Sequence, residues 1–230
     1  SNVDDYSFIV DDIIKKVTKK TKIVFIAQPN NPTGIYLDRK NLNKLLNKIP
    51  KRIMVVIDAA YSEFIDNEDY NDGLNLVMKN SNIIVTHTFS KIYGLASLRL
   101  GWCAAPDRII NLLDKIRGPF NVNQIAQIAG STALSDASYE KKVIRHNTIW
   151  LKKFKSELAK LPVKVYNSQA NFIFIKVRNV KKLNKFLLSN GIIVRTLENY
   201  EIFDCLRISI GTTLENKKFL RVIKKFFDNE

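Results

Sequence analysis

Three short apolar runs constrain the fold of this chain most strongly. They occupy residues 22–27, 53–58 and 83–89, and they lack the alternation of polar and apolar residues that marks a strand with one face in water. Near-continuous apolar strands are typical of a parallel sheet that is covered on both faces. A helical pattern at 38–49 separates the first two runs, and a weaker one at 70–79 separates the next two. This order predicts an α/β fold.

Local signals mark the ends of several of these elements. Asp38 stands where a helix N-cap is expected, directly before the apolar residues of 38–49. A further strand is expected at 98–105, where Pro106 ends it, and two helices follow at about 106–116 and 123–135. The first part of the chain therefore predicts a sheet domain with several helices.

The pattern changes near residue 138. From Ser138 onward, residues such as Leu151, Phe154 and Leu158 keep one apolar face of a single long helix. Further strands are expected at 163–166, 171–177, 192–196 and 206–210, and further helices at 180–189 and 214–227. We expect two domains, 1–136 and 137–230, of which the second is a smaller α+β domain that begins with the long helix.

Composition excludes some classes of function. The net charge is +15, but the lysines are scattered or paired on helical patterns and are not interleaved with aromatic residues on a strand. We therefore expect a solvated basic surface and no nucleic-acid partner. No apolar run reaches the length of a membrane span, and Cys103 and Cys205 have no metal-ligand spacing. We expect a cytoplasmic protein without a metal centre, with both thiols reduced.

Polar clusters follow each of the three apolar runs. They are Asn30–Gly34, Asp58–Tyr61 and Thr88–Leu95, and the last is followed by Arg99. Because the carboxyl ends of parallel strands meet at one edge of a sheet, these groups are expected to line one crevice. Lys91, in the third cluster, can form a Schiff base with a carbonyl cofactor.

A site that holds pyridoxal 5'-phosphate and an amino acid must meet five chemical requirements, four of the cofactor and one of the amino acid. The cofactor's aldehyde needs a lysine amine, its pyridinium nitrogen a carboxylate, its ring oxygen neutral donors, and its phosphate hydroxyl and guanidinium groups. The carboxylate of the amino acid needs a second arginine for bidentate binding. The candidates, in the same order, are Lys91, Asp58, Tyr61 with Asn31, Ser90 with Arg99, and Arg207.

Six segments together resemble one family. They are Pro29–Gly34, Val56–Tyr61, Thr88–Gly101, Ser168–Phe172, Gly191–Arg195 and Asp204–Gly211. The chain resembles the fold-type I pyridoxal-phosphate-dependent aminotransferases, and among them histidinol-phosphate aminotransferase. The resemblance implies part of an aspartate aminotransferase-like large domain with a mostly parallel sheet, followed by the small C-terminal domain.

The resemblance also implies roles for the candidates. Lys91 would hold the cofactor and then move the proton between the substrate's α-carbon and the cofactor. Arg207 would bind the substrate carboxylate, Arg195 the phosphate of a phosphorylated substrate, and Asn171 would lie near the substrate. The implied reaction, in histidine biosynthesis, moves an amino group from an amino acid, glutamate, to a keto substrate such as imidazole-acetol phosphate. The Asn31–Pro32 peptide bond is expected to be cis.

Family members begin well over a hundred residues earlier, so we expect this chain to be a fragment that lacks their N-terminal segment. The fragment alone is expected to be inactive, whereas the full-length form is expected to be a homodimer. Four alternatives stay open: a threonine-phosphate type decarboxylase, another amino-acid transaminase, a cofactor-sensing regulatory domain, and an inactive product of a decayed gene.

Overall fold

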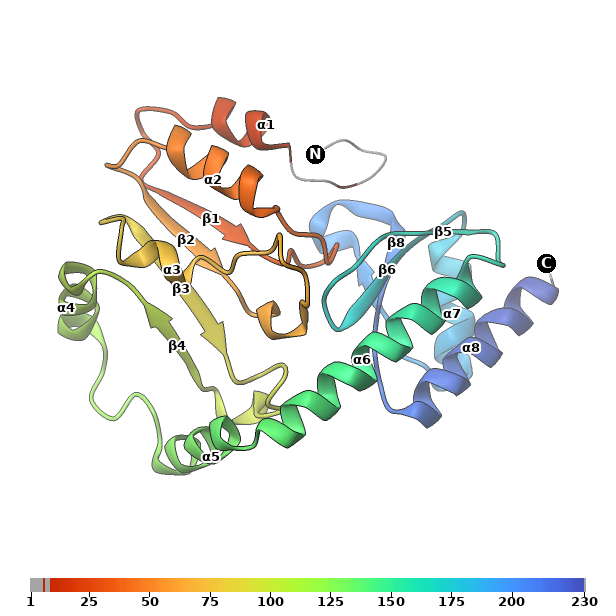
Figure 1. Ribbon diagram of the computed structural model, residues 1–230. Helices are drawn as coiled ribbons and strands as arrows, with labels where there is room; N and C mark the ends of the chain where they lie inside the picture. The colour runs from red at the N-terminus through yellow and green to blue at the C-terminus, as the bar shows by residue number, and fades with distance from the viewer. Residues whose placement is uncertain (1–5, 7–8, 230) are drawn as a thin grey trace. The chain divides into compact units, whose positions relative to one another are not determined.

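The computed structural model describes residue 6 and residues 9–229, which form two compact units. The first unit ends at Asn30, resumes at Tyr36 and continues to Ile144, and the second comprises Asn31–Ile35 and the chain from Arg145. The change from one unit to the other falls within the long helix α6 (Ala137–Leu158), drawn in green in Figure 1. A domain boundary between residues 136 and 137 stays a prediction.

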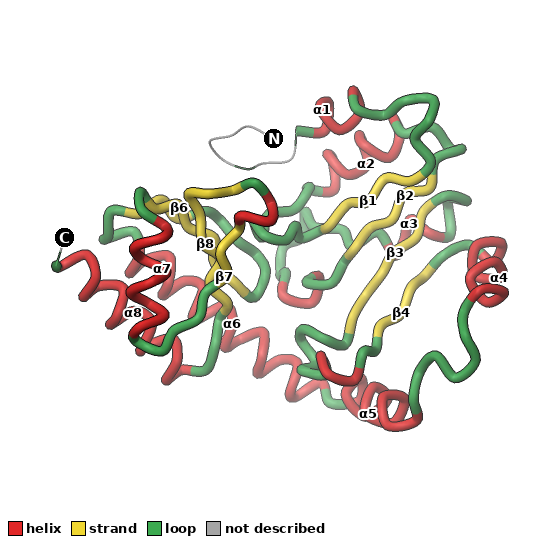
Figure 2. The backbone as a smooth tube through the Cα atoms, turned by 180° about the vertical axis from the view of Figure 1, so that it is seen from behind, coloured by secondary structure: helices red, strands yellow, loops and turns green. Residues whose placement is uncertain are grey.

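The first unit contains the expected mostly parallel sheet. Its strands are β1 (Ile23–Ala27), β2 (Met54–Asp58), β3 (Ile83–Thr88) and β4 (Gly101–Ala104), and they lie side by side in this order. β1, β2 and β3 are parallel, whereas β4 runs antiparallel to β3 (Figure 2). The α/β prediction is therefore confirmed.

Short helices cover one face of this sheet. They are α1 (Val10–Lys15), α2 (Arg39–Lys48) and α3 (Leu74–Val77), and their apolar residues form one core with alternate residues of the strands. Leu42 and Leu45 of α2 are fully buried there. The Asp38 side chain accepts a hydrogen bond from the Asn41 amide, which confirms the expected N-cap. On the opposite face of the sheet, the side chain of Phe25 is exposed.

Two of these helices differ from the sequence prediction. α1 was not predicted, and α3 is shorter than the expected 70–79. Gly73 has a φ of +92°, so no right-handed helix can run through it. The Asn71 side chain accepts from the Gly73 amide at 2.8 Å, and the Asp72 side chain accepts from the Leu74 amide at 3.0 Å. These bonds hold a turn where a helix was expected.

Two further helices follow β4. They are α4 (Asp107–Ile116) and α5 (Gln124–Ser135), close to their expected bounds, and Asn123 caps α5 by accepting from the Ala126 amide at 2.8 Å. Several large apolar side chains of this region are exposed; among them are Leu112, Ile116, Phe120, Ile125 and Ile128.

The second unit is built on an antiparallel sheet. Its strands are β5 (Val163–Val165), β6 (Phe172–Val177), β7 (Arg195–Leu197) and β8 (Ile202–Ser209), in the order β5-β6-β8-β7. The core joins alternate strand residues to the C-terminal part of α6, to α7 (Val180–Ser189) and to α8 (Thr213–Asp228). Phe154, Leu158 and Ile223 are fully buried in it. The expected mixture of strands and helices is therefore present.

Two strands differ from their predicted bounds. β7 begins at Arg195 rather than at residue 192. Ile192 and Val194 pack against the core of the second unit, so their apolar side chains resemble a strand pattern although they lie before the strand. β8 begins four residues earlier than expected. Its first half carries Asp204, which forms an ion pair of 2.9 Å with Lys176 of β6, and such a charged, partly exposed stretch gives a weak strand signal.

No helix in the described part of the chain combines the length and the apolar character that crossing a membrane requires.

Candidate functional site

Asp58 and Tyr61 lie where β2 ends. Asp58 is the last residue of the strand, is exposed, and accepts a hydrogen bond from the Ala60 amide at 3.2 Å through Oδ1. A short 3-10 helix, Ser62–Phe64, follows, and the buried Tyr61 is its N-cap residue. A carboxylate and a phenol therefore follow one strand within four residues.

Lys91 lies in the loop that joins β3 to β4. The loop is folded back on itself, since the Phe89 amide donates to the Leu100 carbonyl at 3.1 Å and the Gly94 amide donates to the Lys91 carbonyl at 3.0 Å. Gly94 has a φ of +68° and Arg99 a φ of +55°, so both residues make left-handed turns. These turns return the chain to the start of the loop, where Leu100, the residue after Arg99, accepts the hydrogen bond from Phe89.

The first unit brings Lys91 and Tyr61 together. The Lys91 Nζ atom lies 5.1 Å from the centroid of the Tyr61 ring. Asp58 and Lys91 come from neighbouring strands, because Asp58 pairs with Thr86 across the β2–β3 ladder. The Ser90 amide donates to the Thr88 side chain at 3.0 Å, which fixes the start of the loop. Five predicted site residues thus belong to one sheet edge: Asp58, Tyr61, Ser90, Lys91 and Arg99.

The other four predicted residues belong to the second unit, and Arg207 is at their centre. It lies in the middle of β8, and its Nη1 atom donates to the Asn31 side-chain oxygen at 2.6 Å. Its guanidinium carbon lies 5.0 Å from the centroid of the Phe172 ring. The buried Nε atom has no hydrogen-bond partner among the described residues. An arginine held in this way keeps N–H donors for an anionic ligand.

Asn31 begins a short segment that packs within the second unit. The Asn31–Pro32 peptide bond is cis, as predicted, and so is Gln28–Pro29. Further along the segment, the Gly34 carbonyl accepts from the Gln169 amide at 2.8 Å. The role of Asn31, with Tyr61, as a donor to the ring oxygen stays a prediction; its side-chain oxygen accepts the hydrogen bond from Arg207.

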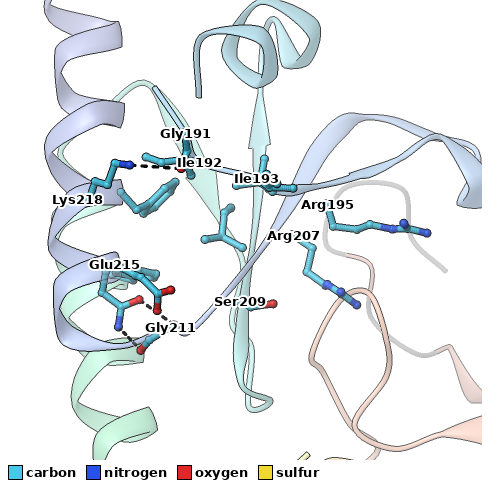
Figure 3. A pocket seen from close by; sticks show the side chains of 14 residues that line it. Gly191, Ile192, Ile193, Arg195, Arg207, Ser209, Gly211, Glu215 and Lys218 are labelled. Carbon is cyan, nitrogen blue, oxygen red and sulfur yellow. Dashed lines mark hydrogen bonds between the residues drawn. The ribbon is translucent and has the colours of Figure 1, made fainter. Parts of the chain in front are cut away.

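Arg195 is the neighbour of Arg207 across the β7–β8 ladder. Residues directly opposite each other on paired strands share a face of the sheet. Figure 3 shows both side chains extending away from α8. Both arginines line a hollow of about 630 Å³ that continues along the residues 191–194 to the start of α8. Two guanidinium groups on one wall suit a ligand with more than one anionic group.

Asn171 lies directly before β6, and its carbonyl accepts from the Ile210 amide at 2.9 Å. Sequence reasoning missed a second asparagine nearby. Asn147 of α6 is buried and donates from its side chain to the Ala170 carbonyl at 3.3 Å, next to Asn171. The sequence contains a signal that could have identified Asn147, because it is a polar residue on the apolar face of the long helix.

Comparison with known proteins identifies the family. Residues 1–223 match the family model described as aminotransferase class I and II. The chain belongs to the class I and II aminotransferases. It is 44% identical over 229 residues to a histidinol-phosphate aminotransferase of Pelagibacter ubique, a match that covers 97% of this chain and 64% of that protein. The aminotransferase chain described here therefore spans less than two thirds of that relative's length.

Solved structures agree with the class I and II fold. The histidinol-phosphate aminotransferase of Clostridium acetobutylicum superposes with a TM-score of 0.89 at 26% identity, over 96% of this chain and 68% of that one. The enzyme of the same name from Sinorhizobium meliloti, in complex with pyridoxal-5'-phosphate, has a TM-score of 0.79 at 25% identity. That match covers 89% of this chain and 58% of that one.

Proposed function

We propose that the protein that contains this chain is a pyridoxal-phosphate-dependent aminotransferase of the histidinol-phosphate type. It would move an amino group from glutamate to a phosphorylated keto substrate such as imidazole-acetol phosphate, in histidine biosynthesis. The observation that carries the proposal is the sheet edge where Lys91 lies over the Tyr61 ring and Asp58 ends the neighbouring strand. The 44% identity to a histidinol-phosphate aminotransferase supports this choice of substrate.

The side chains of this site match the chemical groups of the cofactor. Lys91 would hold it covalently, Asp58 would pair with the pyridinium nitrogen, and Tyr61 would donate to the ring oxygen. The Ser90 hydroxyl and the Arg99 guanidinium would bind the phosphate, and Arg99 is exposed and able to do so. When bound, the cofactor supplies the electron sink that makes removal of a proton from the substrate's α-carbon feasible.

The chain's own residues would do three things during the reaction. The Lys91 amine would take the proton from the α-carbon and return it, since an amine at that point is a general acid–base. Arg207 would bind the α-carboxylate, and the 2.6 Å hydrogen bond to Asn31 would keep its guanidinium group in one orientation. Arg195, on the next strand, would bind the phosphate of the substrate.

We also propose a cytoplasmic homodimer as the working form, with amino acids and keto acids as its small-molecule substrates. The exposed apolar side chains of 112–128 support self-association, because contact with a second copy would remove their apolar surface from water.

The covalent role of Lys91 is tested in the full-length protein. Incubation with pyridoxal phosphate should give a yellow chromophore that borohydride bleaches, and peptide mass spectrometry should map the reduced adduct to Lys91. Lys91→Ala should lose the adduct and the transamination of imidazole-acetol phosphate, whereas Lys79→Ala, an exposed lysine of the same unit, should retain both. An adduct on another lysine would refute the assignment, and carbon dioxide release from threonine phosphate would favour a decarboxylase.

A further inference from the structure

A second pocket lies on the face of the first sheet that the short helices cover, and Leu74 of α3 is one of its lining residues. It has a volume of about 500 Å³, and Glu63, Asp72, His87 and Trp102 are among its lining residues. His87 follows Thr86, which pairs with Asp58 across the β2–β3 ladder. Since successive side chains of a strand point to opposite faces, His87 and Asp58 lie on opposite faces of the sheet. This pocket is therefore separate from the proposed cofactor site.

His87 is held rigidly in the wall of this pocket. Its side chain is only 5% exposed, and its ring stacks on Trp102 with 4.3 Å between the centroids and 3° between the planes. Its Nδ1 atom lies 3.1 Å from Glu63 Oε1 and 3.3 Å from Ser62 Oγ. An ionised carboxylate can only accept, so Nδ1 carries the hydrogen that Glu63 receives. In the neutral ring, Nε2 is then an acceptor.

Several acceptors of the pocket have no donor. His87 Nε2 and Glu63 Oε2 are buried and have no hydrogen-bond partner among the described residues. Asp72 Oδ2 lies 3.8 Å from His87 Nε2, beyond hydrogen-bond distance. Arg39 also lines the pocket, but one of its nitrogens is bound to the Glu68 carbonyl at 2.7 Å. Buried acceptors without donors are unfavourable, so the pocket suits a ligand that brings N–H groups.

We propose that this pocket binds a small organic cation with several N–H donors, either a guanidinium or a primary ammonium group. Its N–H groups would bond to His87 Nε2, Glu63 Oε2 and Asp72 Oδ2, and its charge would compensate the two carboxylates. Trp102 and Leu74 supply apolar surface for the carbon part of the ligand. A metal ion is not the occupant that the geometry favours, because no three His, Cys, Asp or Glu side chains of the described residues are placed so that they could hold one.

The chain offers an internal control for the test, because its other histidine, His146, does not line this pocket, and His87→Gln and His146→Gln variants of the whole protein assign the two signals. His146, in the second unit, bonds through Nε2 to the Gly211 carbonyl at 2.9 Å. The whole protein, labelled with ¹³C-histidine, is titrated with methylguanidinium chloride and followed by NMR. The His87 signal should move saturably while the His146 signal stays in place. Equal movement of both signals, or no saturable movement of the His87 signal, overturns the proposal.

Variants identify the acceptors. Glu63→Gln and Asp72→Asn should each raise the dissociation constant of methylguanidinium about tenfold, since each removes one charge-assisted hydrogen bond. Asp66→Asn, an exposed carboxylate nearby, should leave it unchanged. Circular dichroism confirms that each variant is folded. Equal affinity of the two pocket variants and the wild type overturns the proposal.

The source of the cation is read from a second titration. A capped arginine peptide that binds as tightly as methylguanidinium indicates a protein side chain as the natural occupant, whereas a peptide that fails to bind indicates a free small molecule.

Discussion

Arg207 and Arg195 are neighbours on paired strands, but their surroundings differ. Arg207 is half-buried, bonded to Asn31 and packed against the Phe172 ring. Arg195 is exposed at the start of its strand. A half-buried, oriented guanidinium suits a group that every substrate carries, the α-carboxylate. An exposed one at the rim suits a group that only some substrates carry.

Arg195→Ala should therefore weaken the use of phosphorylated substrates selectively. A charge-assisted pair contributes about 1.5–3 kcal/mol, so kcat/KM for a phosphorylated substrate should fall about tenfold to a hundredfold, and kcat/KM for a non-phosphorylated amino acid should change little. Arg178→Ala, an exposed arginine in the same unit, is the control and should change neither value. Equal losses for both substrates would favour a general transaminase.

Among the elements, the segment 31–35 depends on a single glycine. Gly34 has a φ of +76°, and a Cβ atom there would lie 1.9 Å from Ser168 Oγ and 2.9 Å from the Ser168 Cα atom. A side chain at this position would strain the backbone and separate two segments that pack together. The glycine thus allows the segment that carries Asn31 to approach residues 168–169.

Gly34→Ala should lower the free energy of unfolding by about 2–4 kcal/mol, from the left-handed conformation together with the clash. Urea denaturation of both forms measures the difference. Gly118→Ala is the matched control, because no atom lies within 4 Å of its added Cβ. It should change the stability by no more than about 0.5 kcal/mol. Equal effects of the two substitutions would show that the close approach at Ser168 is not required.

Helices α6 and α8 are joined by a charged cluster. Glu157 of α6 binds Lys160 at 2.7 Å and also Lys224 of α8. These two lysines hold the pKa of the Glu157 carboxyl at about 2, below its ordinary value of 4.5. A lowered pKa means that the ionised form stabilises the folded state, so this contribution is complete above the ordinary pKa and is lost as the pH falls toward 2.

Glu157→Gln should lower the melting temperature modestly at pH 7. The difference from the wild type should stay constant down to about pH 5 and then shrink toward pH 2, because acid also neutralises the wild-type carboxylate. Calorimetry over this pH range measures it, and Glu201→Gln, an exposed glutamate of the same unit, should show no such trend. A difference that persists at pH 2 would mean that Glu157 acts through packing rather than charge.

On the scale of the whole molecule, the exposed apolar side chains of α4, α5 and their connection are candidates for the dimer interface. Phe120 is 96% exposed and Ile116 is 80% exposed. Burial of each such side chain contributes about 1.5–3 kcal/mol. The double variant Ile116→Asp, Phe120→Asp should therefore raise the dimer dissociation constant about a hundredfold or more in sedimentation of the full-length protein.

Met78→Asp is the control for this prediction. Met78 is also an exposed apolar residue of the first unit but lies outside 112–128. It should leave the dimer intact, and a dimer unaffected by the double variant would place the interface elsewhere. The inactivity of the 230 residues by themselves stays a prediction, which a transamination assay of this segment would test.

Local patterns in the sequence determined much of the fold. Apolar runs and helical spacing predicted β1–β3, α2, α4, α5 and the start of α6 almost to the residue, because these patterns depend on neighbours only a few positions away. The cap at Asp38 is equally local. Lys91 and Arg99 could be named as partners in one site because the turns between them are short.

The tertiary structure decided what depends on contacts between distant segments. Arg207 and Asn31 are 176 positions apart, and nothing local in the sequence predicts their hydrogen bond. Nothing near His87 in the sequence shows its surroundings, and only the packing of Glu63, Asp72 and Trp102 around it leaves its Nε2 atom buried without a hydrogen-bond partner among the described residues. Such contacts depend on strand register and chain reversal, which the local pattern of apolar and polar residues does not determine.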